Sequence, residues 1–352
     1  MSILKKPFGS LPGGQAVQEY TLTNRIGASV RIITFGGIIT SIRVPDKTGA
    51  LAEVTLGFDE LAPYLEKNGS LGALIGRYGN RIAKGQFTLD GQTYQLALTN
   101  GKNHLHGGVV GFGVQVWEAS PEEGQGVDKL HLHLVSPDGQ ENYPGRLTVD
   151  VTYSFNDDCE LSIRYRAVTD KPTVLNLTNH AYFNLAGADG RTVLDHEITI
   201  PADFITETDE GLIPTGKLLP VTGTAFDLRR PTVIGKGIEM GKDDVNIRYG
   251  MGGYDHNFVL GEPFVMKKAA LLRDPASGRV MEVTTDQPAV QFYTANQQGI
   301  PGRNGSYFGK QCALCLETQH YPDAPNHPNF PSTVLRPGET FNSITVYAFR
   351  AE

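Results

Sequence analysis

Side chains able to move protons or bind polar ligands are concentrated in five short stretches of this sequence. Each stretch combines histidine, carboxylate, amide or arginine residues with glycine or proline, a composition typical of loops. The stretches are GRYGNRIAKG at 76–85, NHLHGG at 103–108, LNLTNHAYFNLAG at 175–187, GYDHNF at 253–258 and CLETQHYPDAPNHP at 315–328. Brought together by a fold, such loops would form a polar small-molecule site with groups suited to acid–base chemistry.

Taken singly, these residues have ordinary structural explanations. His180 could be a hydrogen-bonded core histidine, and Glu317 could pair with a cation at a strand end. Arg81 could form a surface ion pair, and Asp255 could hold its own loop through an Asx turn. A functional interpretation therefore depends on the stretches acting together.

His104 and His106, one residue apart and followed by two glycines, allow three interpretations. On a strand, residues i and i+2 share a face, so the pair could hold a metal ion. It could also line a polar binding edge or belong to a solvated turn. A metal site would need further ligands, for which His180 and Glu317 are available.

Three more motifs are interpreted as structural. His131 and His133 alternate with leucines, which predicts a solvated outer face of a strand. Cys312 and Cys315 form a C-x-x-C inside the apolar run CALCLE; on a strand they point to opposite faces and cannot share one ion. The stretch GKGIEMGK at 235–242 departs from a phosphate-binding loop in its glycine spacing and in the residue after the lysine.

Alternation of apolar and polar residues is the main secondary-structure signal. Residues 147–155 and 161–167 alternate strictly around the turn at 156–158, which predicts an antiparallel hairpin. A second hairpin is predicted at QFTLDGQTYQL, residues 86–96, with Asp-Gly in its two-residue turn. Further strands are predicted at SVRIITF, DKLHLHLV, AVQFYT and ITVYAF. Only LAPYLEKN, at 61–68, could form about two helical turns.

The whole-chain composition favours one all-β domain with little helix. The 352 residues contain 41 glycines and 21 prolines, spread along the chain as many turns between short strands require. No linker, repeat or shift in composition marks a boundary, so residues 1–352 are predicted to form a single sandwich-like or barrel-like domain.

Charge and cysteine content limit the partners and the location. The net charge is -7 and no basic block is present, so a nucleic-acid partner is not expected. No apolar run approaches the ~18 residues of a membrane span, and the amino-terminal residues lack the apolar region of a cleaved signal. Three cysteines cannot build a disulfide framework. A cytoplasmic enzyme is therefore expected.

In their order along the chain, the motifs GRYGNRI, NHLHGG, NLTNHAYFNLAG, GYDHNF, VQFYTAN and LETQHYPDAPN closely resemble those of the aldose 1-epimerase (galactose mutarotase) family. The resemblance extends from about Phe8 to the carboxyl terminus. It implies a large antiparallel β-sandwich, the galactose mutarotase-like supersandwich. It also implies interconversion of the α and β anomers of aldoses such as galactose or glucose. This reaction needs no cofactor or metal, and a monomer or a homodimer is expected.

The resemblance assigns roles to individual residues. His180 is expected to be the general acid, Glu317 the general base and His106 a sugar-binding residue. Contacts to sugar hydroxyls are expected from Asn80, Arg81, Tyr182, Asp255 and Gln291. His180 is expected to stay protonated near neutral pH if Asp255 or another carboxylate lies close, with Glu317 ionised.

The chain departs from the family pattern at two positions, and three rival functions stay open. Ala225 stands where proline is common and Gln297 where an apolar residue is usual, which bears on loop shape and substrate range. A hexose-6-phosphate 1-epimerase would need an arginine cluster, for which Arg77 and Arg81 are close in sequence. A metal-dependent His-x-His β-barrel enzyme and a non-catalytic sugar sensor are the two further rivals. The sensor would be marked by loss of His180 or Glu317, which are both present.

Overall fold

The computed structural model describes residues 2–66, 69–297 and 299–352. Within these ranges the strands form three large sheets and five strand pairs, and every pairing between them is antiparallel. The predicted all-β class is confirmed.

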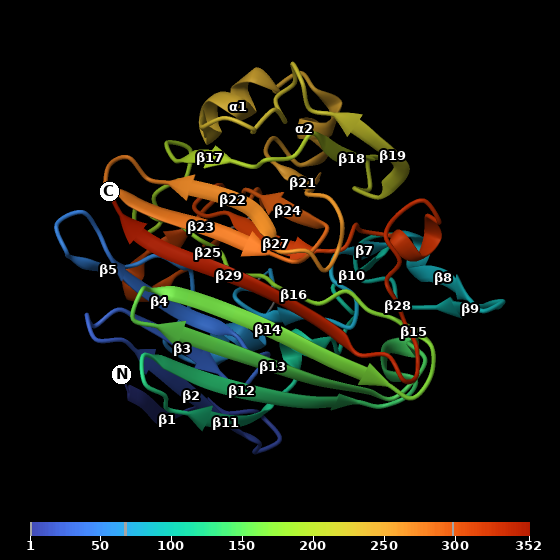
Figure 1. Cartoon of the computed structure of the whole chain (residues 1–352), viewed down its shortest axis with the longest axis horizontal. Coiled ribbons are helices and arrows are strands. Elements are labelled where there is room, and N and C mark those ends of the chain that lie inside the picture. Colours follow the sequence, from blue (N-terminus) through green and yellow to red (C-terminus); the bar gives the residue numbers. More distant parts are fainter. Residues whose placement is uncertain (1, 67–68, 298) are drawn as a thin grey trace.

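The largest sheet has nine strands and forms one extended layer (Figure 1). In spatial order its strands are β11 (Glu118–Glu122), β12 (Val127–Ser136), β13 (Leu147–Asn156), β14 (Glu160–Thr169), β29 (Phe341–Ala351), β23 (Arg279–Thr285), β22 (Lys267–Arg273), β17 (Glu197–Thr199) and β20 (Thr232–Val233). The carboxyl-terminal strand β29 therefore lies in the middle of the layer and joins its two halves.

Two five-stranded sheets supply the opposing surfaces. The first is β1 (Ser2–Ser10), β2 (Ala16–Thr23), β3 (Ser29–Ile33), β4 (Ile39–Pro45) and β5 (Leu51–Glu53). The second, in spatial order, is β19 (Pro214–Pro220), β18 (Phe204–Thr208), β21 (Asp255–Val259), β24 (Ala289–Tyr293) and β27 (Cys315–Gln319). One hydrophobic core joins all three sheets through residues such as Ile32, Val151 and Phe292. Its burial is the main favourable term in the stability of the sandwich.

Five short strand pairs lie outside the three large sheets. They are β6 (Leu74–Ile75) with β16 (Thr178–Asn179), β7 (Arg81–Ile82) with β10 (His104–Leu105), β8 (Gln86–Leu89) with β9 (Gln92–Gln95), β15 (Thr173–Val174) with β28 (Val334–Leu335), and β25 (Ile300–Pro301) with β26 (Tyr307–Phe308). Both strands of the β7–β10 pair, and strand β16 of the β6–β16 pair, belong to the predicted polar stretches.

The alternating segments fold as predicted. The long hairpin is β13–β14, with Phe155 opposite Leu161, and the short hairpin is β8–β9. Asp90 and Gly91 both have positive φ, 49° and 81°, as a two-residue type I′ turn requires. His131 and His133 face outward from β12 while Leu130 and Leu132 are buried, which confirms the solvated face.

Helix is scarce but its location differs from the prediction. The segment at 61–68 contains the 3₁₀ turn Ala62–Leu65 (η1); residues 67 and 68 lie outside the described ranges. Two short α-helices were not predicted: α1 (Ile234–Met240), which contains most of the GKGIEMGK stretch, and α2 (Val245–Tyr249). The remaining 3₁₀ turns are Ala83–Gly85, Phe112–Val114, Gln140–Asn142, Arg303–Gly305 and Ala324–Asn326. No helix of the described residues is long and apolar enough to cross a membrane.

Candidate active site

The five polar stretches meet around one cavity of about 420 Å³. Its lining includes seven of the eight residues singled out from the sequence: Asn80, Arg81, His106, His180, Tyr182, Asp255 and Glu317. The eighth, Gln291, lies next to this lining, and its Nε2 donates a 2.6 Å hydrogen bond to Asp255 Oδ1. The sequence-predicted residues are therefore close together in space, although they come from separate parts of the chain.

Three neighbouring strands present the acidic and amide residues from one face. Asp255 begins β21, Gln291 lies in β24 and Glu317 lies in β27. In the register of the sheet, Gln291 is opposite Glu317 and Tyr293 is opposite Asp255. Because side chains alternate between the two faces of a strand, all four of these residues share one face.

His104 and His106 point in different directions although they are only two residues apart. The short strand β10 ends at Leu105, and His106 has a φ of 52°, outside the strand region. His104 is fully buried away from the cavity; its Nδ1 donates to the Ala97 carbonyl at 2.8 Å, and its Nε2 accepts from Tyr143 Oη at 2.8 Å. The strand-face argument for a His-x-His metal clamp is therefore wrong, because the strand ends between the two rings.

His106 is held by two hydrogen bonds to one residue. The backbone N–H of Asn80 donates to His106 Nδ1 at 3.2 Å, and the N–H of His106 donates to the Asn80 carbonyl at 3.0 Å. Burial lowers the pKa of His106 well below its usual value, so the ring is neutral at neutral pH. A neutral ring that accepts at Nδ1 carries its hydrogen on Nε2, which makes Nε2 a hydrogen-bond donor.

A metal site has one geometric point in its favour. Ligand-type atoms of His106, His180 and Glu317 lie within 4.8 Å of one another. However, a metal-bound histidine normally donates its other ring N–H to an acceptor, whereas Nδ1 of His106 receives a hydrogen bond from Asn80. Binding a metal at Nε2 would require a hydrogen on Nδ1, directed at that N–H group. The donor set is therefore better suited to hydroxyl groups than to a cation.

The His180 ring is held from several sides. His180 directly follows β16, and its backbone N–H donates to the Ala73 carbonyl. The ring stacks on Tyr182, with centroids 4.9 Å apart and planes at 23°, and meets the edge of His106 at 5.2 Å. Its Nε2 lies 3.6 Å from Glu317 Oε1, and its Nδ1 lies 3.4 Å from Cys315 Sγ.

Burial dominates the protonation of the His180–Glu317 pair. It lowers the pKa of His180 to about 4, against the smaller opposing effects of a hydrogen bond to the residue's own backbone and of Asp255, and it raises the pKa of Glu317 well above its usual value. The expectation that His180 stays protonated near neutral pH in the empty site is therefore wrong, because desolvation outweighs the nearby carboxylate. Each effect favours the uncharged pair, a neutral imidazole beside a carboxylic acid.

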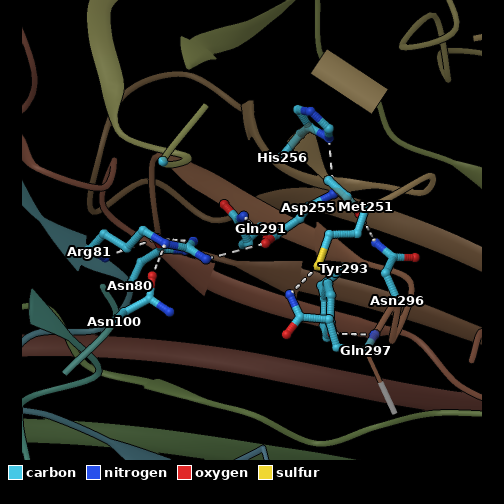
Figure 2. Close-up of polar contacts among 12 residues, drawn as sticks. Asn80, Arg81, Asn100, Met251, Asp255, His256, Gln291, Tyr293, Asn296 and Gln297 are labelled. Atoms are coloured by element: carbon cyan, nitrogen blue, oxygen red, sulfur yellow. Dashed lines mark hydrogen bonds and ion pairs between the residues drawn. The ribbon is translucent and has the colours of Figure 1, made fainter. Parts of the chain in front are cut away.

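Arg81 and Asp255 both line the cavity, and Arg81 reaches the Asp255 carboxylate from strand β7 (Figure 2). Its Nη2 lies 3.6 Å from Asp255 Oδ2, and its Nε donates to Asn100 Oδ1 at 3.3 Å. The remaining Asp255 oxygen accepts from Gln291, so three side chains fix one another before any ligand binds. Fixed donors and acceptors of this kind suit a ligand rich in hydroxyl groups.

Two further residues lie at the site without having been singled out. Tyr293 lines the cavity, and its ring meets those of His180 and Tyr182 edge-on at 6.4 and 6.2 Å. Cys315 touches His180 and was considered only as half of a C-x-x-C pair; the described cysteines are free and buried. Strand period could have found it, because Cys315 is two residues from Glu317 and shares its face.

Comparison with known proteins agrees with this geometry. Residues 18–348 match the aldose 1-epimerase family. Galactose mutarotase of Mus musculus is 46% identical over 352 residues, covering 99% of both chains. Aldose 1-epimerase of Escherichia coli K12 is 38% identical, covering 97% of both. The crystal structure of galactose 1-epimerase from Lactobacillus acidophilus superposes with a TM-score of 0.85 at 27% identity, covering 99% of both chains. The chain belongs to the aldose 1-epimerase family.

Proposed function

We propose that His180 and Glu317 are the acid–base pair with which this chain interconverts the α and β anomers of an aldose. The chain is an aldose 1-epimerase by family membership, and hence an isomerase. The observation that carries the residue assignment is a buried imidazole and carboxylate 3.6 Å apart in a cavity lined by polar groups.

The reaction moves two protons around one ring bond. Glu317, as carboxylate, removes the proton of the anomeric hydroxyl, while the imidazolium of His180 gives a proton to the ring oxygen. The bond between C1 and the ring oxygen then breaks and an aldehyde forms. After rotation about C1–C2, the protonated Glu317 gives its proton to the aldehyde oxygen, and the neutral His180 takes the proton from the hydroxyl that was the ring oxygen, as the ring closes on the other face of C1.

The pair needs only one proton throughout this cycle. The charged form, imidazolium with carboxylate, acts on the ring form of the sugar, and the uncharged form acts on the open chain. Burial favours the uncharged form in the empty site. The charge of Arg81 lowers the pKa of Glu317, and sugar hydroxyls bound to the carboxylate would add to this effect. Ligand binding would therefore shift the proton towards His180.

The remaining residues are proposed to hold the sugar or to shape its site. The Nε2–H of His106 would donate to a hydroxyl, and Arg81, Asn80 and Asp255 would bind further hydroxyls. Tyr182 Oη already donates to the Gly69 carbonyl at 2.9 Å. Gln291 is likewise engaged with Asp255, so we assign these two to support of His180 and Asp255 rather than to direct hydroxyl contact.

A phosphorylated sugar is a weaker candidate substrate. Its dianion would need more than one arginine in the cavity. Arg77 is buried elsewhere, and its guanidinium donates to Ser136 Oγ and to the carbonyls of Ser136, Pro137 and Pro144. A neutral aldose therefore fits better, and a panel of aldoses would identify which one.

Four further assignments are proposed for the whole chain. We infer a cytoplasmic location, since the cysteines are free and buried in the described structure. We infer one domain over residues 1–352, since one core joins the three large sheets. The net charge of -7 gives no reason to propose a nucleic-acid partner. A monomer or homodimer is proposed, to be measured by light scattering.

The test separates binding from turnover. Glu317→Gln keeps the side-chain shape but removes the base, so mutarotation followed by polarimetry should fall by about 10²–10⁴. Sugar binding, measured by calorimetry, should persist. His180→Asn should behave alike, and the double variant should be only slightly worse than either, since the groups act as a unit. Near-normal turnover of Glu317→Gln would move the base to Asp255.

A further inference from the structure

The two nitrogens of the His180 imidazole each face a side chain of strand β27. Its Nε2 faces Glu317 Oε1 at 3.6 Å and its Nδ1 faces Cys315 Sγ at 3.4 Å. Cys315 and Glu317 are two residues apart on β27, so they project from the same face. One strand thus contacts both nitrogens of the ring.

Ring contacts cannot by themselves decide which nitrogen carries the hydrogen of neutral His180. Stacking on Tyr182 and the edge contacts with His106 and Tyr293 fix the plane of the ring. Stacking on Tyr182 does not distinguish the two nitrogens, because a face-to-face ring contact is insensitive to the position of one N–H. The groups facing the two nitrogens must make this distinction.

Acid–base work at Nε2 requires a hydrogen that stays on Nδ1. The imidazolium has hydrogens on both nitrogens, and after Nε2 gives its proton to the sugar, the neutral ring must retain the one on Nδ1. A thiol is suited to this position, since its sulfur accepts weakly and its S–H is a poor donor to a bare Nδ1. Burial raises the pKa of Cys315 well above its usual value, so the group stays a neutral thiol.

Resting on the acid–base roles proposed above, we propose that Cys315 is a positioning residue that keeps the hydrogen of neutral His180 on Nδ1. Nε2 is thereby left as the nitrogen that exchanges a proton with the sugar. Cys315 does not itself touch the sugar, because it is absent from the residues that line the cavity. A hydroxyl in its place would donate more strongly to Nδ1 and favour the unproductive form with the hydrogen on Nε2.

The test compares Cys315→Ala, Cys315→Ser and Cys312→Ala. Cys312 is a matched control: it is also a buried free thiol, and it lies three residues before Cys315, outside the cavity lining. In ¹⁵N-histidine-labelled protein, the His180 signals are identified by their loss in His180→Asn. Their shifts report which nitrogen carries the hydrogen, and polarimetry across pH gives kcat and KM.

Wild type and Cys312→Ala should show the hydrogen on Nδ1 and equal kcat. Cys315→Ala should lose about tenfold in kcat, the equivalent of one hydrogen bond, with KM within about twofold. Cys315→Ser, which is nearly isosteric, should shift the His180 signals towards the Nε2–H form and lose kcat in proportion, and both variants should have an altered pH profile.

Two outcomes would overturn the proposal. One is a loss of kcat in either Cys315 variant with the His180 signals unchanged, which would indicate packing alone. The second is unchanged kcat in a variant whose tautomer has shifted. A wild-type protein without mutarotase activity would instead refute the proposed acid–base roles, and the NMR comparison would remain interpretable by itself.

Discussion

Each of the imidazoles of His104, His106 and His180 is defined by the group that faces its Nδ1 atom. His104 Nδ1 donates to a carbonyl, His106 Nδ1 accepts from a backbone N–H, and His180 Nδ1 faces a thiol. These partners assign the Nε2 atoms different chemistry: an acceptor for Tyr143, a donor towards the cavity and a nitrogen able to exchange a proton. Residue type alone, which is what the sequence provides, is the same in all three.

The contrast between His104 and His106 can be measured. His106→Ala removes a donor from the cavity, so KM should rise or kcat fall by about tenfold or more, with little loss of stability. His104→Ala leaves the Tyr143 hydroxyl and the Ala97 carbonyl without their partner in the core. It should cost about 1–3 kcal/mol of unfolding free energy and have the smaller effect on KM.

Polarimetry on the two variants, with urea unfolding of each, separates these effects. A His104→Ala protein of normal stability but impaired sugar binding would contradict the tautomers assigned to the two rings.

At the scale of elements, alternation identified strands but not their ends or their neighbours. The β13–β14 and β8–β9 hairpins were predictable because a local period and a local turn specify them. The end of β10 at Leu105 was not, because it depends on the pairing with β7 and on the positive φ of His106. Helices α1 and α2 were missed because seven and five residues give too little periodicity.

The glycines after His106 provide an element-scale prediction. Gly107 has a φ of 82°, and a Cβ there would lie 1.9 Å from the Gly76 carbonyl oxygen. Gly101, in the turn before β10, also has a positive φ, 62°, but a Cβ there would meet no atom within 4 Å. Gly101→Ala should therefore cost only the backbone strain, about 1 kcal/mol, whereas Gly107→Ala should cost several times more and displace His106.

Thermal unfolding and KM of the two alanine variants test this difference. Equal losses of stability would show that backbone conformation, and not the close approach to Gly76, determines why glycine is needed.

At the scale of the whole molecule, the site depends on long-range order that no local pattern contains. Strand β29 inserts between β14 and β23, and the strands that carry Asp255, Gln291 and Glu317 come from separate regions of the chain. Family resemblance, rather than periodicity, predicted that these residues would meet. The structure adds what the resemblance does not contain: burial disfavours the charged form of both His180 and Glu317.

Burial of neutral histidines also predicts how the whole fold responds to acid. His196, His256 and His320 lie outside the cavity lining, and burial lowers the pKa of each to about 4. In the unfolded chain they titrate near 6.5, so between pH 6.5 and 4 the unfolded state binds more protons than the folded state. These histidines do not lower the free energy of unfolding above pH 6.5. As the pH falls from 6.5 to 5, each of them lowers the free energy of unfolding by on the order of 2 kcal/mol.

Urea unfolding followed through the single tryptophan, Trp117, should show a lower unfolding free energy at pH 5 than at pH 7. Raised carboxyl pKa values, such as those of Glu53 and Asp323, oppose this loss, so the sharper measurement is a difference between proteins. His320→Gln removes one buried imidazole. The difference in unfolding free energy between pH 7 and pH 5 should therefore be about 2 kcal/mol smaller in this variant than in the wild type, whatever the stability of the variant at pH 7. If the variant kept the full wild-type gap, His320 would be charged in the folded protein, and acid sensitivity would have to come from different groups.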